Sequence, residues 1–414
     1  MKRLLILTLF SSTMTFGQLT DQDLAKIDSL RQVISTTKED SIKVKAYAKW
    51  DIIVYKSDPQ LDAILVHKMD SLCDKNLKGR LSSSERKFFE LRKAWIHWSY
   101  GILERDQRNY QKSTGHYKSA AKIYKKYDNS SRYSRVVHAA GLNFYHQNEL
   151  DSAMVYFNQS WEVKKEIDYY KGLGYTYMDI GSVYAKRKTY DQALNYLNQS
   201  LAVYDSLKLP DEKKDVFHRI GEVYLDQRDF KKASNYLEKA LEIEERLQDV
   251  RGLKATYVSL SNLNYSMGNT EKGKRFRDLA VSVYTQLSDS IGLFSLYFDN
   301  GKRLVEHGNY SLANEYLTQA QVVAQELNSP KLEAKAHWYL GWSNSQMGHY
   351  EESLTNFGSS YDLRKKLKDK FAQASALMKM AQSHRFLEHK ELAMKLSQKA
   401  IELVSAEKTS RQKA

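Results

Sequence analysis

The chain has 414 residues, of which 42% are hydrophobic and 28% are charged, a balance typical of a folded protein rather than a disordered one. Its single cysteine excludes an internal disulfide framework and a zinc site built from several cysteines. The formal net charge of +14 would suit acidic partners, but no RNA- or DNA-binding motif accompanies it, so nucleic acid is not expected as a partner.

The first 17 residues have the layout of a secretory signal peptide. A basic start, residues 1–3, precedes a mainly apolar stretch, residues 4–16, and Thr15 and Gly17 are the small residues expected before a cleavage site. The apolar stretch is shorter than the roughly 20 residues that a membrane helix needs. The sequence therefore predicts an exported protein, periplasmic or secreted, without stable membrane insertion.

Residues 18–81 are predicted to form N-terminal helices that include a degenerate first repeat. Thr20 can cap the first helix, whose apolar residues follow at spacings of three, and two further helical segments come after it. Ala63 precedes its counterpart Ser113 by 50 residues, whereas the later repeats are 40 residues long. About ten residues are therefore inserted, and we expect the insertion around residues 78–84.

Residues 82–406 carry eight repeats with a period of 40, and residues 407–414 form a basic tail. A glycine column recurs at this period, with Ser261 and Ala381 in its two gaps, and further small residues follow 12 and 19 positions later. The members of the column are Gly101, Gly141, Gly181, Gly221, Gly301 and Gly341. Such a period predicts a solenoid of antiparallel helix pairs. In each repeat, helix A carries the glycine and helix B carries the other two small residues.

The glycine column predicts close contact between helices, because glycine inside a helix costs about 1 kcal/mol relative to alanine and must be offset by packing. A second set of glycines, Gly172, Gly252 and Gly292, recurs between helix B and the next helix A. We expect these three to provide the positive φ that ends a helix.

These columns resemble the tetratricopeptide repeat, whose signature places a glycine, an aromatic residue and two alanines at fixed spacings. Gly221, Tyr224, Ala233 and Ala240 match that signature within one repeat. The period here is 40 residues rather than 34, as in repeats with longer helices and turns. The resemblance implies an all-α fold, a right-handed superhelical solenoid of antiparallel helix pairs, with the A helices lining a concave groove.

The resemblance also implies which positions of helix A face the groove: six before, three before, one after and four after the first small residue. A groove rich in aromatic residues with scattered charge suits a peptide or another protein. The candidate partner-binding residues are Trp338, Trp342, Phe298, Lys302, Lys335, Met378, Trp95, Trp98, Tyr175 and His218.

The sequence contains none of the short motifs that mark a catalytic or metal site. There is no H-E-x-x-H, P-loop, G-x-S-x-G or G-x-G-x-x-G. We therefore expect a non-enzyme without a cofactor, and we interpret it as an exported interaction scaffold. The alternative is an extracytoplasmic sensory module, because the chain resembles the repeat regions of bacterial sensor histidine kinases and LuxR-type regulators. The partner's identity and the oligomeric state stay open.

Overall fold

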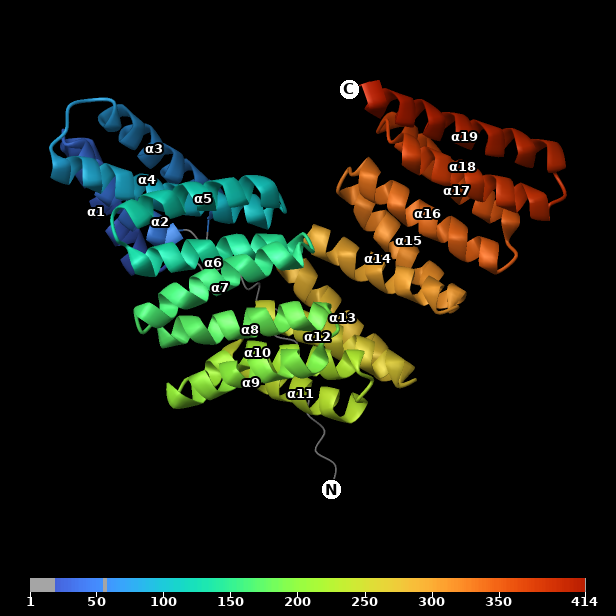
Figure 1. Ribbon diagram of the computed structural model, residues 1–414, viewed down its shortest axis with the longest axis horizontal. Helices are drawn as coiled ribbons and strands as arrows, with labels where there is room; N and C mark the ends of the chain where they lie inside the picture. The colour runs from blue at the N-terminus through green and yellow to red at the C-terminus, as the bar shows by residue number, and fades with distance from the viewer. Residues whose placement is uncertain (1–18, 55–57, 414) are drawn as a thin grey trace. The chain divides into compact units, whose positions relative to one another are not determined.

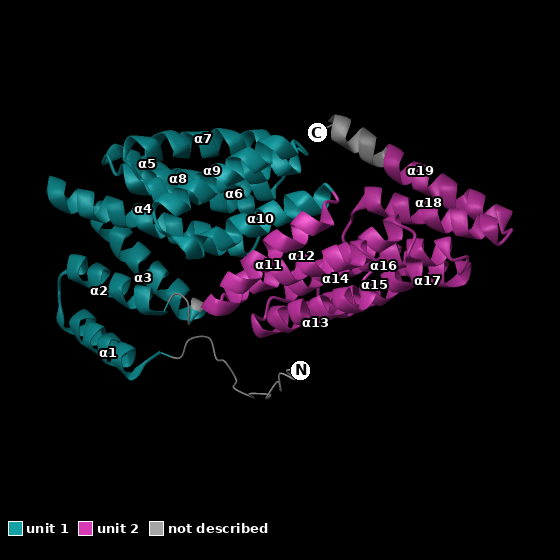
Figure 2. Ribbon diagram, turned by 90° about the horizontal axis from the view of Figure 1, so that it is seen from below, with its two compact units in different colours: residues 1–227 teal, residues 228–414 magenta. Residues whose placement is uncertain are grey.

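The computed structural model describes residues 19–54 and 58–413, and over these residues it contains nineteen α-helices, one 3-10 helix and no strand. The all-α solenoid of paired helices is thereby confirmed, whereas the predicted signal peptide lies outside the described residues. The chain divides into two compact units, unit 1 ending at Gln227 and unit 2 beginning at Arg228 (Figure 2). None of the described helices is long and apolar enough to cross a bilayer.

Each unit is a succession of helices joined by short turns (Figure 1). The elements of unit 1 are α1 (Asp21–Thr36), α2 (Asp40–Val54), α3 (Pro59–Leu77), α4 (Ser83–Asp106), α5 (Tyr110–Lys126), α6 (Ser130–His146), α7 (Leu150–Glu166), α8 (Tyr170–Lys186), α9 (Tyr190–Ser206), the 3-10 helix η1 (Pro210–Glu212) and α10 (Lys213–Asp226). Those of unit 2 are α11 (Phe230–Leu247), α12 (Val250–Ser266), α13 (Thr270–Gln286), α14 (Ser290–Glu306), α15 (Tyr310–Glu326), α16 (Pro330–Gln346), α17 (Tyr350–Lys366), α18 (Lys370–Phe386) and α19 (Lys390–Lys413). Even-numbered helices from α4 onward are the A helices of the repeats.

The turns show that each 40-residue repeat consists of two similar halves of 20 residues. A typical half is a 17-residue helix followed by a three-residue turn whose middle residue has positive φ. At the end of α4, Arg108 has φ 62°, and the N–H of Asn109 donates to the carbonyl of Glu104 over 2.8 Å. The turn occupies three of the four carbonyl groups that the last helical turn would otherwise leave without partners, those of Leu103, Glu104 and Arg105.

The expectation for the second set of glycines is wrong. Gly172, Gly252 and Gly292 lie inside the first turns of α8, α12 and α14, and the positive φ belongs to the residues four positions earlier, Asp168, Gln248 and Ser288. These glycines are needed for space instead. A Cβ at Gly172 would lie 3.1 Å from Lys164 Cδ, and one at Gly252 would lie 2.8 Å from Glu244 Oε1.

The ten-residue insertion is mostly helical. Helix α4 has 24 residues, whereas α6 and α8 have 17 each, so seven of the extra residues extend the N-terminal end of α4. Ser82 caps this longer helix through a reciprocal capping box with Glu85. The extension places Phe88 and Phe89 against a core cluster that also contains Met69 and the buried Cys73.

A bulky residue of the paired B helix, 16 positions later in the sequence, packs against Gly101, Gly141, Gly181, Gly301 and Gly341. A Cβ added at Gly141 would lie 2.7 Å from the Phe157 ring, and one at Gly301 would lie 2.6 Å from Leu317 Cγ. Where Ser261 replaces the glycine, Gly273 stands opposite and the Ser261 hydroxyl donates to its carbonyl over 2.8 Å. Close packing of the two helices therefore explains the 40-residue column.

Candidate interaction surface on the A helices

Several successive A helices contact one another within their own unit. Helix α8 touches both α6 and α10 in unit 1, and α16 touches both α14 and α18 in unit 2. Side chains from neighbouring repeats can therefore combine into one continuous surface, which is the arrangement that the sequence-based hypothesis requires.

In unit 2, four rings from α14 and α16 form a connected group, which we call the aromatic strip: Phe298, Trp338, Tyr339 and Trp342. The Phe298 and Tyr339 rings meet edge to face at 5.3 Å, and Tyr339 lies 5.0 Å from Trp338 and 5.7 Å from Trp342. Two ammonium groups lie near these rings. Lys302 Nζ is 6.0 Å from the Tyr339 ring and Lys379 Nζ is 5.7 Å from the Trp342 ring.

The two tryptophans of the strip differ in their surroundings. Trp338 lies 6.0 Å from the fully buried Phe357, and its indole N–H is buried with no hydrogen-bond partner among the described residues. Trp342 is half-buried and packs at the edge of the core cluster around Leu340. Trp342 is therefore the better candidate for contact with a partner, whereas Trp338 also supports the core.

The two remaining candidates of unit 2 are exposed to solvent and lie outside the aromatic strip. Lys335 is exposed, and Met378 is 50% exposed. Within the part of the chain that the structure describes, no ion pair or ring contact joins either residue to the aromatic strip. Lys302 also approaches Glu306 at 3.9 Å, so its charge is partly balanced within α14.

The unit 1 candidates are more deeply packed. Trp95 and Trp98 on α4 are half-buried, and each has a guanidinium over its ring, Arg92 at 5.4 Å and Arg135 at 4.8 Å. His218 on α10 is only 8% exposed. The structure therefore gives His218 little surface to offer to a partner.

Tyr175 on α8 takes part in contacts within unit 1. Its hydroxyl donates to Glu212 of η1, and its ring meets Tyr204 edge to face at 5.9 Å. Burial, followed by the neighbouring Glu212 carboxylate, raises the pKa of Tyr175 well above its usual value. The hydroxyl therefore stays protonated and links two successive repeats.

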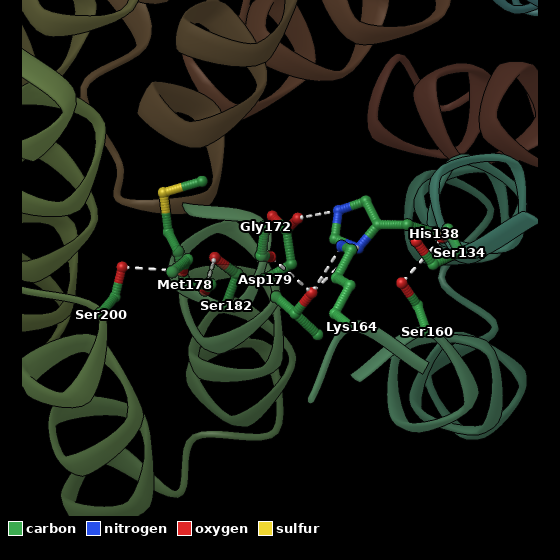
Figure 3. Close-up of polar contacts among 11 residues, drawn as sticks. Ser134, His138, Ser160, Lys164, Gly172, Met178, Asp179, Ser182 and Ser200 are labelled. Carbon is green, nitrogen blue, oxygen red and sulfur yellow. Dashed lines mark hydrogen bonds and ion pairs between the residues drawn. The ribbon is translucent and has the colours of Figure 1, made fainter. Parts of the chain in front are cut away.

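A buried polar cluster joins α6, α7 and α8 (Figure 3). Lys164 Nζ donates to Thr176 Oγ1 over 2.8 Å and lies 3.3 Å from His138 Nδ1, while His138 Nε2 lies 2.7 Å from Asp179 Oδ2. Because an ammonium group only donates, Nδ1 of His138 must accept. The imidazole proton is therefore on Nε2 and is donated to Asp179.

The electrostatics of this cluster agree with a neutral imidazole between two opposite charges. Burial, and then the Lys164 charge, lower the pKa of His138. Burial also lowers the pKa of Lys164 to about 8, against an opposing effect of Asp179. Lys164 is only 3% exposed, so Asp179 is the counter-charge that keeps it ionised near neutral pH.

The groove positions predicted from the sequence leave out one position of helix A whose side chains take part in the contacts described above. It lies two residues before the small residue. Asp179, Arg219, Tyr339 and Lys379 all occupy it, preceding Gly181, Gly221, Gly341 and Ala381. This position lies on the same helical face as those six before and one after, at spacings of four and three. The charged residues that recur there are the signal that could have identified it.

Comparison with known proteins identifies the repeat. A family model described as tetratricopeptide repeat matches residues 173–246. No curated protein sequence matches the chain.

Solved structures share the fold at low sequence identity. The apo form of RapI is 18% identical with a TM-score of 0.55, and the alignment covers 69% of this chain and 99% of that one. A signal transduction ATPase with numerous domains, from Pyrococcus horikoshii and with a tetratricopeptide repeat sensor, is 16% identical with a TM-score of 0.54, covering 89% of this chain and 56% of that one. The Rap conjugation gene regulator of plasmid pLS20, in complex with the Phr* peptide, is 14% identical with a TM-score of 0.51, covering 84% and 96%.

Proposed function

Because the chain contains tetratricopeptide repeats, we propose that it is an exported scaffold that binds a peptide or protein segment on its A helices, with the aromatic strip of unit 2 as the main contact. The observation that carries the proposal is the juxtaposition of apolar rings with two ammonium groups. Trp342 supplies a half-buried indole, and Lys302 and Lys379 supply positive charge beside the rings. This chemistry suits a segment with hydrophobic anchors and acidic flanks.

Three further points support the proposal. The pLS20 regulator, which has the same fold, was solved with a peptide bound. The pattern of residues 1–17 favours export. The role we propose is non-catalytic, since the sequence carries none of the short catalytic motifs sought above.

A sensory module is the second candidate. The Pyrococcus horikoshii protein with the same fold carries its tetratricopeptide repeats as a sensor within a larger signalling protein. In that case the same surface would bind a signal peptide. Co-purification with a signalling partner that depends on the peptide would favour this candidate over a passive scaffold.

The surface can be tested with a random peptide library selected against the full chain. We expect enrichment of peptides that combine aromatic or large aliphatic residues with Asp or Glu. Trp342→Ala should weaken binding of an enriched peptide about thirtyfold, because truncating an interface tryptophan commonly costs about 2 kcal/mol. Fluorescence anisotropy measures the affinity, and circular dichroism checks that helicity is kept.

Phe386→Ala is the matched control, because Phe386 is an exposed ring of α18 that stacks on Tyr350 rather than on the strip. This variant should bind the selected peptides normally. If both variants lose the same peptide affinity, the contact does not lie on the aromatic strip. The same conclusion follows if the selected peptides bind a folded Trp342→Ala chain with unchanged affinity.

A further inference from the structure

A second candidate site lies in unit 1 and contains no residue of the aromatic strip. A pocket of about 530 Å³ opens between α2, α4, the last turn of α5 and the first turn of α6. Four cationic side chains line it: Lys45, Lys49, Arg92 and Arg132. Such a volume is within the range of small-molecule sites, which is roughly 300–1,000 Å³.

Aromatic rings of the same pocket orient three of the four cations. Lys45 Nζ lies 5.2 Å from the Phe88 ring, and the Arg92 guanidinium lies 5.4 Å from the Trp95 ring. The Arg132 guanidinium lies 5.9 Å from the Tyr124 ring and also donates to its hydroxyl over 3.5 Å. These contacts restrict the side chains before any ligand arrives, which lowers the entropic cost of binding.

The pocket has no matching negative charge. None of the described residues that line it is acidic, and none of the four cations forms an ion pair with a described carboxylate. Asp51 is the carboxyl group whose charge would act on Arg92, but burial, together with the neighbouring Asp62, raises the pKa of Asp51 to about 8. The raised pKa weakens the negative charge of Asp51, so Asp51 balances little of the positive charge of the pocket.

Two guanidinium groups beside two ammonium groups are the donor set that binds clustered anionic oxygens, because the guanidinium fork matches carboxylate and phosphate geometry. An anion bound here would also relieve the repulsion that Arg92 experiences from Arg132. Burial and that repulsion both lower the pKa of Arg92.

We propose that this pocket binds a small organic anion with two or more neighbouring negative charges, either a phosphate ester or a polycarboxylate. The proposal does not depend on the aromatic strip, because the strip and the pocket have no residue in common. It adds a ligand-binding function that a peptide scaffold would not need.

Isothermal titration calorimetry of the full chain, at low ionic strength, tests the proposal with three probes: AMP, citrate and uncharged adenosine. We expect AMP, citrate or both to bind with one-to-one stoichiometry, and adenosine not to bind. Binding of AMP alone would identify phosphate esters as the ligand class, and binding of citrate alone would identify polycarboxylates. If neither anion binds, or if adenosine binds as tightly as AMP, the proposal is overturned.

The cations of the pocket can be removed in two ways. Arg92→Gln combined with Arg132→Gln should weaken anion binding at least about tenfold, a difference of about 1.4 kcal/mol, because it removes both guanidinium groups that would donate to the anion. Lys45→Gln combined with Lys49→Gln changes only exposed side chains. If the arginine variant does not fold, this lysine variant tests whether the cations of the pocket bind the anion, and it should also weaken binding.

The control is Lys118→Gln combined with Lys165→Gln, which removes two exposed charges of unit 1 that do not line the pocket. Its anion affinity should stay within about twofold of the unchanged chain, a difference of about 0.4 kcal/mol. A folded pocket variant with unchanged affinity, or an equal loss in the control, would show that overall charge rather than the pocket attracts the anion.

Discussion

Gly101→Ala is expected to lower the free energy of unfolding by about 2 kcal/mol, although alanine is the better helix former by about 1 kcal/mol. The added Cβ would lie 2.6 Å from Tyr117 Cδ1. Tyr117 is only 1% exposed, so its ring has no free space to move into. Urea denaturation followed by circular dichroism measures the loss.

Gly115→Ala is the matched control, since Gly115 lies in α5 of the same unit and a Cβ there would meet nothing within 4 Å. This variant should gain about 0.5–1 kcal/mol from helix propensity and from a less flexible unfolded chain. Equal stability of the two variants would contradict the explanation of the glycine column by close packing.

Most of the fold could be predicted from sequence because the helix pairs repeat without slippage. Small residues that recur at the same position of the 40-residue repeat identify where two helices meet. The packing of Gly141 on Phe157 shows why that position has to be the same in successive repeats. The turns were harder to predict. Among the residues that the structure describes, twelve residues other than glycine have positive φ, including Arg108, Asp168 and Lys188. Their identities vary because the cap is stabilised by backbone hydrogen bonds rather than by a particular side chain.

The candidate site could be predicted only in part. Helical periodicity places Trp338 and Trp342 on one face, but it does not show that the Trp338 indole packs against Phe357. The buried cluster was beyond prediction for a different reason. Lys164 belongs to a B helix and its partners His138 and Asp179 belong to two A helices, so no spacing within one repeat relates the three residues.

This cluster supports the second large effect. Asp179→Asn should lower the free energy of unfolding by about 3 kcal/mol at pH 7, because it leaves the buried Lys164 ammonium without its counter-charge. The asparagine side chain can still accept the hydrogen bond from His138 Nε2. The loss of stability therefore comes mainly from the unbalanced charge of Lys164, and its size should depend on pH.

The sign of that dependence follows from the pKa of Lys164, which burial lowers from 10.5 to about 8. Between these values the folded state binds fewer protons than the unfolded state, so the cost of burying the charge is present below pH 8 and disappears as the pH rises. Asp179 opposes this lowering, so removing it should lower the Lys164 pKa further. The deficit of Asp179→Asn should therefore be larger at pH 6.5 than at pH 9.

Lys164→Met added to Asp179→Asn removes the buried charge as well as its partner. Lys164 and Asp179 are not in direct contact, since His138 lies between them. Removing both of two opposite buried charges is often nearly neutral, whereas removing one of a contacting pair costs about 3–5 kcal/mol. The double variant should therefore regain most of the stability lost by Asp179→Asn, and its stability relative to the unchanged chain should vary less with pH. Urea midpoints of the three chains at pH 6.5 and 9 measure both effects. A deficit that is the same at both pH values and persists in the double variant would mean that Asp179 acts through packing or hydrogen bonding, and that the charge of Lys164 does not depend on it.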